Sequence, residues 1–440
     1  MLRPIFLLAA ALSTSACASR IELPGTVLPP EEAAIAVEGM GAPVEWRAVD
    51  AGTARIADTA GLELLGEDFP DSSSVALRRL TLHFRQEDWE AVGLHAEWHL
   101  DRGYRLSDGA LGQIGGNLGE EARVNAAALA ARLDAEAELL GDSSSPFTEI
   151  PGSVALPESV LRDESNQRTL ATSIVSRGLF VQDDGEAWRE VAIENAGSLA
   201  GIALDAPRGL IWVGSGVVDP TPDPETAFRG VIAIDRITLE ERRRVPAPEG
   251  VSISDIAVGP DGTVYGSDPI GGGIYMAALG DATMQTFIAP GTFRSPQGIA
   301  VRPDNAALYV SDYRYGLAQV MIRSRTAYRM RAAEPMLLDG VDGLWLRGNE
   351  LIAVQNGVQP HRITAFTLGQ GIGVIASHRI LEMANPAWTE PLGGAVTGDS
   401  LYYIGGGQWD IYGEGGALNE GASPRSSSVH RLPLVETPQE

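Results

Sequence analysis

The chain has 440 residues, of which 44% are hydrophobic and only 6% aromatic, and it contains 51 glycines. A chain of this length exceeds one ordinary domain, so we expect several units or one large repeat array rich in turns. The formal net charge of −25 repels nucleic acid and anionic lipid headgroups, which excludes both as natural partners.

Residues 1–17 have the organisation of an export signal. Met1-Leu2-Arg3 is a short basic start, and the apolar residues 5–12 are too few to span a membrane. Small residues then lead to Cys17, which is the only cysteine in the chain, so no disulfide can form within it. The pattern predicts that the protein is exported.

Cys17 resembles the lipid-attachment cysteine of bacterial lipoproteins, because it directly follows the small residues of the signal. One departure is Thr14, where that pattern prefers an aliphatic residue. The resemblance implies an exported protein that is lipid-anchored to the cell envelope, and Ala18-Ser19 after the cysteine favours the outer membrane. Simple cleavage with secretion is the alternative.

The region between the signal and the repeats differs from the rest of the chain. Residues 18–40 mix Pro, Gly and Glu without periodicity, which is typical of a tether. Residues 41–150 are interpreted as a small α/β region, with a strand at 75–84 and helical spacing at 88–102 and 120–140. No motif assigns this region a function, and it would be either a cap or an extra layer on the following domain.

Residues 151–436 repeat one unit, in which two short apolar strands are joined by a turn and followed by a Gly-rich or polar loop. Six copies of the strand pair are spaced roughly 40–55 residues apart, the length of a four-stranded propeller blade. The copies start at Pro157, Ala200, Ser254, Gln297, Asp342 and Leu392. A third strand follows in several copies, as at 273–276, 318–321 and 362–366. The pattern predicts an all-β fold, a six-bladed β-propeller; a seventh blade drawn from 60–115 is the alternative.

At these repeats the chain resembles the gluconolactonase / senescence-marker-protein superfamily of six-bladed propellers. In that family one divalent cation, usually calcium, is held on the central axis by a Glu, two Asn and an Asp that begin inner strands. Glu158 and Asp342 match the two acidic positions, whereas Ser254, followed by Asp255, and Gln297 replace the two Asn. The resemblance therefore implies a partly altered site for Ca²⁺ or another divalent cation, since all these side chains offer oxygen ligands. A water-filled polar channel is the alternative.

The inner strands of a propeller run in one direction, so their first residues surround one mouth of the channel, and the loops after the second strands lie on the same face. Polar and aromatic side chains around a concave mouth suit a small-molecule ligand. The pocket candidates in these loops are Tyr313, Arg314, Tyr315, Gln355, Asn356 and Trp409. His361 is the one histidine expected on this face and is a candidate general base, with a plain loop histidine as the alternative. The long segments 217–230 and 408–428 would be a lid or surface loops.

Two functions agree with these features. The first is a cell-envelope hydrolase of lactones or esters that depends on a divalent cation, with Asp342 or His361 taking the proton of a water. The second is a non-catalytic propeller at the outer membrane that binds a ligand or a protein partner. A propeller serves either use, so the fold does not decide between them. No serine-hydrolase elbow and no His/Cys cluster for zinc is found in the sequence.

Overall fold

The computed structural model describes residue 37, residues 40–49 and residues 59–434. All of them belong to the second of two compact units, residues 35–440. The expected export signal with Cys17, and almost all of the expected tether, lie outside the described residues. Within the described part of the chain, no helix combines the length and hydropathy needed to cross a bilayer.

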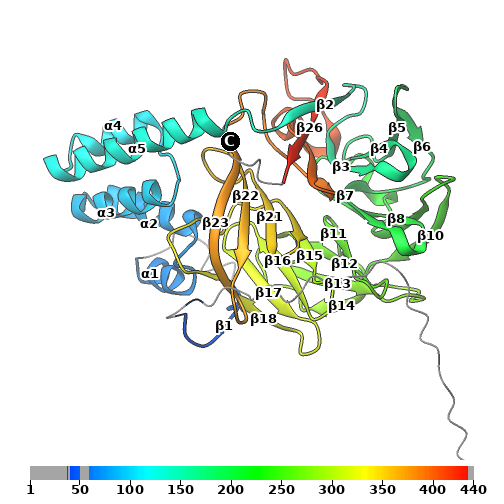
Figure 1. The fold of residues 1–440 in the computed structure, drawn as a ribbon, viewed down its shortest axis with the longest axis horizontal. Coiled ribbons are helices and arrows are strands. Elements are labelled where there is room, and N and C mark those ends of the chain that lie inside the picture. Colours follow the sequence, from blue (N-terminus) through cyan, green and yellow to red (C-terminus); the bar gives the residue numbers. More distant parts are fainter. Residues whose placement is uncertain (1–36, 38–39, 50–58, 435–440) are drawn as a thin grey trace, which may run out of the picture. The chain divides into compact units, whose positions relative to one another are not determined.

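Six sheets follow one another along the described chain, and each contains one of the strand pairs predicted from the repeats (Figure 1). In order from the inner strand outward, the first three are β3 (Pro157–Asp163), β4 (Arg168–Ser173), β5 (Leu179–Asp183), β6 (Arg189–Val191); β7 (Ser198–Asp205), β8 (Leu210–Gly216), β9 (Gly230–Asp235), β10 (Glu241–Pro246); and β11 (Ile256–Val258), β12 (Val264–Asp268), β13 (Gly273–Ala277), β14 (Gln285–Ile288).

The last three sheets recruit additional strands at their outer edges. In the same order they are β15 (Pro296–Val301), β16 (Ala307–Asp312), β17 (Gly316–Met321), β18 (Thr326–Arg329), β1 (Val44–Glu45); β20 (Gly343–Arg347), β21 (Glu350–Gln355), β22 (Arg362–Leu368), β23 (Val374–Met383), β19 (Arg331–Ala332); and β24 (Gly394–Thr397), β25 (Ser400–Ile404), β26 (Ser427–Pro433), β2 (Ser145–Ile150). The expected third strands are therefore present as β13, β17 and β22.

The inner strands of the six sheets close into a ring. Strand β3 contacts β7, β7 contacts β11, and the series continues through β15 and β20 to β24, which contacts β3 again. Each sheet is thus one blade around a common axis, and we number the blades 1 to 6 in chain order. The predicted β-propeller fold is confirmed, and the described strands form six blades.

The ring is closed by a strand from outside the repeats. Strand β2 pairs antiparallel with β26 as the outer strand of blade 6, so strands far apart in the sequence lie side by side (Figure 1). The propeller therefore starts at Ser145 and not at 151, the expected domain boundary. Because the chain continues from β2 into β3 of blade 1, the pairing of β2 with β26 holds the first and last blades together.

The region before β2 contains five helices and the short strand β1, in agreement with the expected α/β region. Its helices are α1 (Thr59–Asp68), α2 (Ser73–Arg85), α3 (Trp89–Asp101), α4 (Asp108–Gly115) and α5 (Glu120–Leu140). The helices expected at 88–102 and 120–140 are confirmed, whereas the strand expected at 75–84 is wrong, because that segment is α2. The buried Val75, Ala76 and Leu80 have helical spacing, and the Ser72 side chain accepts a hydrogen bond from the Val75 N–H at the start of the helix. These helices also rule out a seventh blade from 60–115.

The helical region packs on the mouth-side loops of blades 4 and 5. A carboxylate of the propeller, Asp339, accepts hydrogen bonds from Ser73 Oγ at 2.9 Å and from the Ser74 N–H at 2.8 Å, at the N-terminus of α2. A negative charge is favourable at that end of a helix. The rings of Phe69 and Tyr315 pack 4.9 Å apart between α1 and blade 4. Of the two roles considered for this region, the contacts fit an extra layer on the propeller.

The end of the ring opposite the inner-strand starts contains an ion pair between blades. Asp163, the last residue of β3, is fully buried and binds the Arg236 guanidinium with both oxygens, one at 2.9 Å. Burial opposes the charge of Asp163, but the bonds from Arg236 and Asn166 outweigh it and lower its pKa. The pair therefore ties blade 1 to blade 2.

Candidate functional site

Six side chains or backbone positions, one from the start of each inner strand, line a cavity on the propeller axis. They are Glu158, Ala200, Ser254, Gln297, Asp342 and Gly393. We call these six residues the inner-strand ring. All four residues placed at this mouth by the sequence, namely Glu158, Ser254, Gln297 and Asp342, therefore line one cavity.

Local backbone irregularities present this ring to the channel. The pairing of the inner strand with the second strand shifts between Pro157 and Val160 in blade 1, and between Pro296 and Ile299 in blade 4. Each shift contains a residue of the ring, and a proline, which has no N–H to give to the ladder, precedes it. Glu158, Ser254, Gln297 and Asp342 are accordingly only partly buried, whereas Ala200 is buried.

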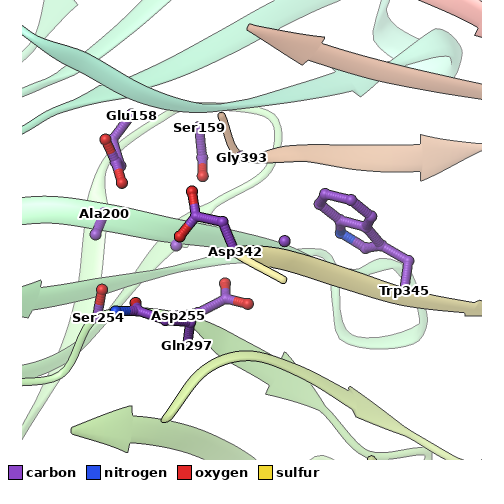
Figure 2. Close-up of a pocket in the computed structure, with 11 residues that line it drawn as sticks. Glu158, Ser159, Ala200, Ser254, Asp255, Gln297, Asp342, Trp345 and Gly393 are labelled. Carbon is purple, nitrogen blue, oxygen red and sulfur yellow. The ribbon is translucent and has the colours of Figure 1, made fainter. Parts of the chain in front are cut away.

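Glu158 and Asp342 form an acidic pair across the channel. Their carboxylates point into the same space, with the Ser254 hydroxyl beside them (Figure 2). Glu158 Oε2 accepts a hydrogen bond from Trp409 Nε1 at 2.9 Å, and Asp342 Oδ2 accepts one from Asn356 Nδ2 at 3.0 Å. Two neutral donors thus orient the carboxylates without neutralising their charge.

The electrostatics of the pair are unfavourable for two ionised carboxylates. Burial raises the pKa of Asp342 to about 6, against the hydrogen bond from Asn356. Burial and then the charge of Asp342 raise the pKa of Glu158 well above its usual range, and Glu390 and Asp255 act in the same direction. The repulsion belongs to the pair, and we assign it to Glu158 as the carboxylate that ionises second. A bound cation would relieve this repulsion.

Asp255 has a second role that the sequence did not indicate. Its two oxygens accept hydrogen bonds from the backbone N–H groups of Ile256 at 2.9 Å and of Ile299 at 3.1 Å, in the next blade. A Cβ at Gly201 would lie 2.5 Å from Asp255 Oδ1, so glycine is needed for this approach of blade 2. In Figure 2 the Asp255 carboxylate points away from Glu158. Asp255 therefore joins three neighbouring blades, and its predicted role as a cation ligand stays a prediction.

The expected pocket residues divide into two groups. Asn356 and Trp409 contact the acidic pair, and the Tyr313 hydroxyl donates to Asn356 Oδ1 at 3.0 Å. Tyr315 is instead buried beneath α1, and Gln355 is buried with its amide donating to the Leu337 and Asp339 carbonyls. Arg314 is exposed on the same loop as Tyr313.

His361 is not among the residues that line the cavity. Its Nδ1 is 3.2 Å from the Val358 carbonyl oxygen, and burial lowers the pKa of the ring, with a smaller contribution from Arg362. A neutral imidazole is thus favoured. The geometry gives its predicted role as a general base no direct support, so that role stays a prediction.

Two residues near the site were missed from the sequence. Trp345 lines the cavity, and its ring covers Gly343, where a Cβ would lie 2.3 Å from the indole. Glu390 repels Asp342, and burial followed by the charges of Asp342 and Asp410 raises its pKa to about 7. Glu390 precedes Pro391, whereas Glu158 and Gln297 follow their prolines, so the repeat gave no signal for Glu390.

The cavity is small. Its volume is about 20 Å³, which suits one water or one monatomic ion. Across residues 40–49 and 59–434, no group of three or more His, Cys, Asp or Glu side chains is gathered closely enough to hold a metal by itself. Any cation here would therefore also need the neutral oxygens of Ser254 and Gln297. This oxygen-only donor set fits a hard cation such as Ca²⁺.

No family model and no curated relative matches this chain. Among solved structures, a calcium-binding regucalcin from Agrobacterium tumefaciens is 14% identical, with a TM-score of 0.43 over 66% of this chain and 95% of that one. A gluconolactonase from Xanthomonas campestris is 15% identical, with a TM-score of 0.44 over 67% and 90%. A virginiamycin B lyase from Staphylococcus aureus is 13% identical, with a TM-score of 0.44 over 58% and 80%. The fold assignment rests on the strand topology, and similarity at this level gives no information on activity.

Proposed function

We propose that the protein is a divalent-cation-dependent hydrolase of lactones or simple esters, related to the gluconolactonase / senescence-marker-protein propellers. The observation that carries the proposal is the acidic pair of Glu158 and Asp342, which meets the oxygens of Ser254 and Gln297 at one end of the channel. Uncompensated carboxylates beside neutral oxygens are the ligands that Ca²⁺ prefers.

The residues of the ring would have distinct roles. Glu158, Ser254, Gln297 and Asp342 would hold the cation, which when bound supplies a Lewis acid for a carbonyl oxygen and lowers the pKa of a water. Asp342, oriented by the amide of Asn356, is better placed than His361 to take a proton at the cavity, because it lines the cavity and His361 does not.

A non-catalytic propeller that binds a ligand or a protein partner is the second candidate. It is favoured by one observation, the replacement of both Asn positions by Ser254 and Gln297, which leaves the expected ligand set incomplete. The two candidates differ in whether a cation stabilises the protein and whether a lactone is turned over.

We further propose that the protein acts at the cell envelope, attached through lipid on Cys17 and exported to the outer membrane. Changing Cys17→Ser should move the protein from the membrane fraction to the soluble fraction of fractionated cells. A variant that stays with the membrane would contradict the lipid anchor.

The test of the hydrolase is thermal unfolding with and without calcium, in the wild type, in Asp342→Ala and in the exposed control Glu67→Gln. A ligand that binds only the folded protein stabilises it by about 2.7 kcal/mol at a hundredfold excess over its Kd. We expect Ca²⁺ to raise the Tm of the wild type and of Glu67→Gln, and to leave Asp342→Ala unchanged. Turnover of simple lactones should be lost in the same variant. If calcium leaves the Tm unchanged and no divalent metal supports lactone turnover, the hydrolase is rejected and the non-catalytic binding propeller is the remaining candidate.

A further inference from the structure

Residues 408–426, in the segment that joins β25 to β26, contact the mouth at Glu158. Gln408 anchors its base, because its amide donates to the Arg425 carbonyl and to Ser427 Oγ at 2.9 Å and accepts from the Arg425 N–H at 2.8 Å. Between these anchors, residues 409–424 cross to blades 1 and 2, where the Gly415 N–H binds the Asp219 carbonyl at 2.8 Å. We call residues 409–424 the flap.

Two contacts hold the flap against the mouth, and both involve residues that line the cavity. The Trp409 indole N–H donates to Glu158 Oε2 at 2.9 Å. Next to it, Tyr412 packs in an apolar cluster with Leu156, Ile174 and Ala200. Ala200 belongs to the inner-strand ring, so the flap packs directly on residues that line the cavity.

The closed arrangement leaves no room for an organic ligand. The cavity volume of about 20 Å³ is far below the roughly 300 Å³ or more that small-molecule sites usually offer. A lactone or ester would therefore need a wider mouth to reach Glu158 and Asp342, and the flap, which contacts Glu158, is a segment whose movement would widen it, as lids move in many enzymes.

The flap also contains a feature that favours its opening. Tyr412 is 9% exposed, and its hydroxyl has no hydrogen-bond partner among the described residues. A buried hydroxyl without a partner destabilises the state that buries it, and opening would return this hydroxyl to water. The hydrogen bond from Trp409 to Glu158 and the unpartnered Tyr412 hydroxyl thus act in opposite directions on one equilibrium.

We propose that the flap is a gate over the cavity, that Trp409 is its latch on Glu158, and that organic ligands enter the proposed hydrolase site when this latch is released. The identity of the ligand rests on the proposed function. The motion of the flap does not, because the latch is a hydrogen bond within the protein.

The experiment is hydrogen exchange, followed by mass spectrometry, on the full chain in chelator without any ligand. Trp409→Phe keeps an apolar ring but removes the N–H, and amides of the flap should exchange roughly tenfold faster, because the hydrogen bond to the Glu158 carboxyl group is lost. Tyr412→Phe removes the unpartnered hydroxyl and should slow the same amides by a similar factor. Trp188→Phe is the matched control, because the Trp188 indole donates to the Glu149 carbonyl at 2.8 Å, outside the flap, and it should leave flap exchange unchanged.

Exchange in β15, β16 and β17 of blade 4 reports global folding and should be equal in all four proteins. Flap exchange in Trp409→Phe equal to that of the wild type, or faster exchange in Tyr412→Phe, would overturn the gate. The result is independent of the hydrolase test. If the flap responds as expected while calcium leaves the Tm unchanged, the gate stands and the hydrolase fails. If calcium raises the Tm while the flap does not respond, the gate alone fails.

Discussion

The acidic pair predicts that a substitution in the site stabilises the protein when no cation is present. Folding raises the pKa of Asp342 from its ordinary value of 3.8 to about 6. Each pKa unit corresponds to about 1.4 kcal/mol, so the ionised carboxylate costs about 3 kcal/mol above pH 7. Because Asp342 borders the channel and is only partly buried, water reduces this cost, and we expect about 1–2 kcal/mol. Asp342→Asn removes the charge and keeps an oxygen that can accept from Asn356.

The effect should depend on pH in a defined direction. A carboxyl whose pKa is raised by folding binds more protons in the folded than in the unfolded protein between the two pKa values, so stability falls as the pH rises through this window. For Asp342 the window runs from 3.8 to about 6. The advantage of Asp342→Asn should therefore be complete at pH 8 and nearly absent at pH 4.

The assay is thermal unfolding in chelator at pH 8 and pH 4, with Glu67→Gln as an exposed acid-to-amide control. A gain of about 1–2 kcal/mol corresponds to roughly 1–2 °C in Tm for a protein of this size. An Asp342→Asn variant that is less stable than the wild type at pH 8, or equally shifted at both pH values, would refute the reasoning.

Three further predictions concern the propeller. Arg236→Ala should destabilise the protein by about 3 kcal/mol in urea unfolding, because it leaves the buried Asp163 carboxylate without its counter-charge. Since folding lowers the pKa of Asp163, this loss of stability should shrink as the pH falls below about 4. A loss that does not depend on pH would contradict the prediction. Asp339→Ala should speed hydrogen exchange at the N-terminus of α2 more than elsewhere; uniform exchange would argue against capping. Gly201→Ala should cost about 1–3 kcal/mol through its contact with Asp255, and an unchanged urea midpoint would show that the blades can yield.

The helical region shows where local sequence patterns were ambiguous. Residues 120–140 have an uninterrupted helical period and no glycine or proline, so their helix could be predicted to the residue. Residues 75–84 contain apolar side chains at spacings that fit a strand or a helix. The helix was decided by the Ser72 cap and by Asp339, more than 260 residues away in the sequence. The spacing of residues in one segment cannot reveal the contact with Asp339.

The candidate site shows the same division. The repeat register alone was enough to bring Glu158, Ser254, Gln297 and Asp342 to one cavity, because the starts of equivalent inner strands must meet at one end of a propeller axis. Which neighbours act on these residues was decided by loops whose lengths differ from blade to blade. The bond from Trp409 to Glu158 therefore depends on the tertiary path of the flap.

The sequence by itself thus determined the repeat, the β-propeller fold and four residues of the inner-strand ring, because these follow from periodicity and strand direction. Only the tertiary structure decided the closure of the ring by β2, the absence of His361 from the cavity lining and the contact of the flap with Glu158. The physical reason is that each of these depends on contacts between segments far apart in the chain, and such contacts leave no periodic signal in the residues that make them.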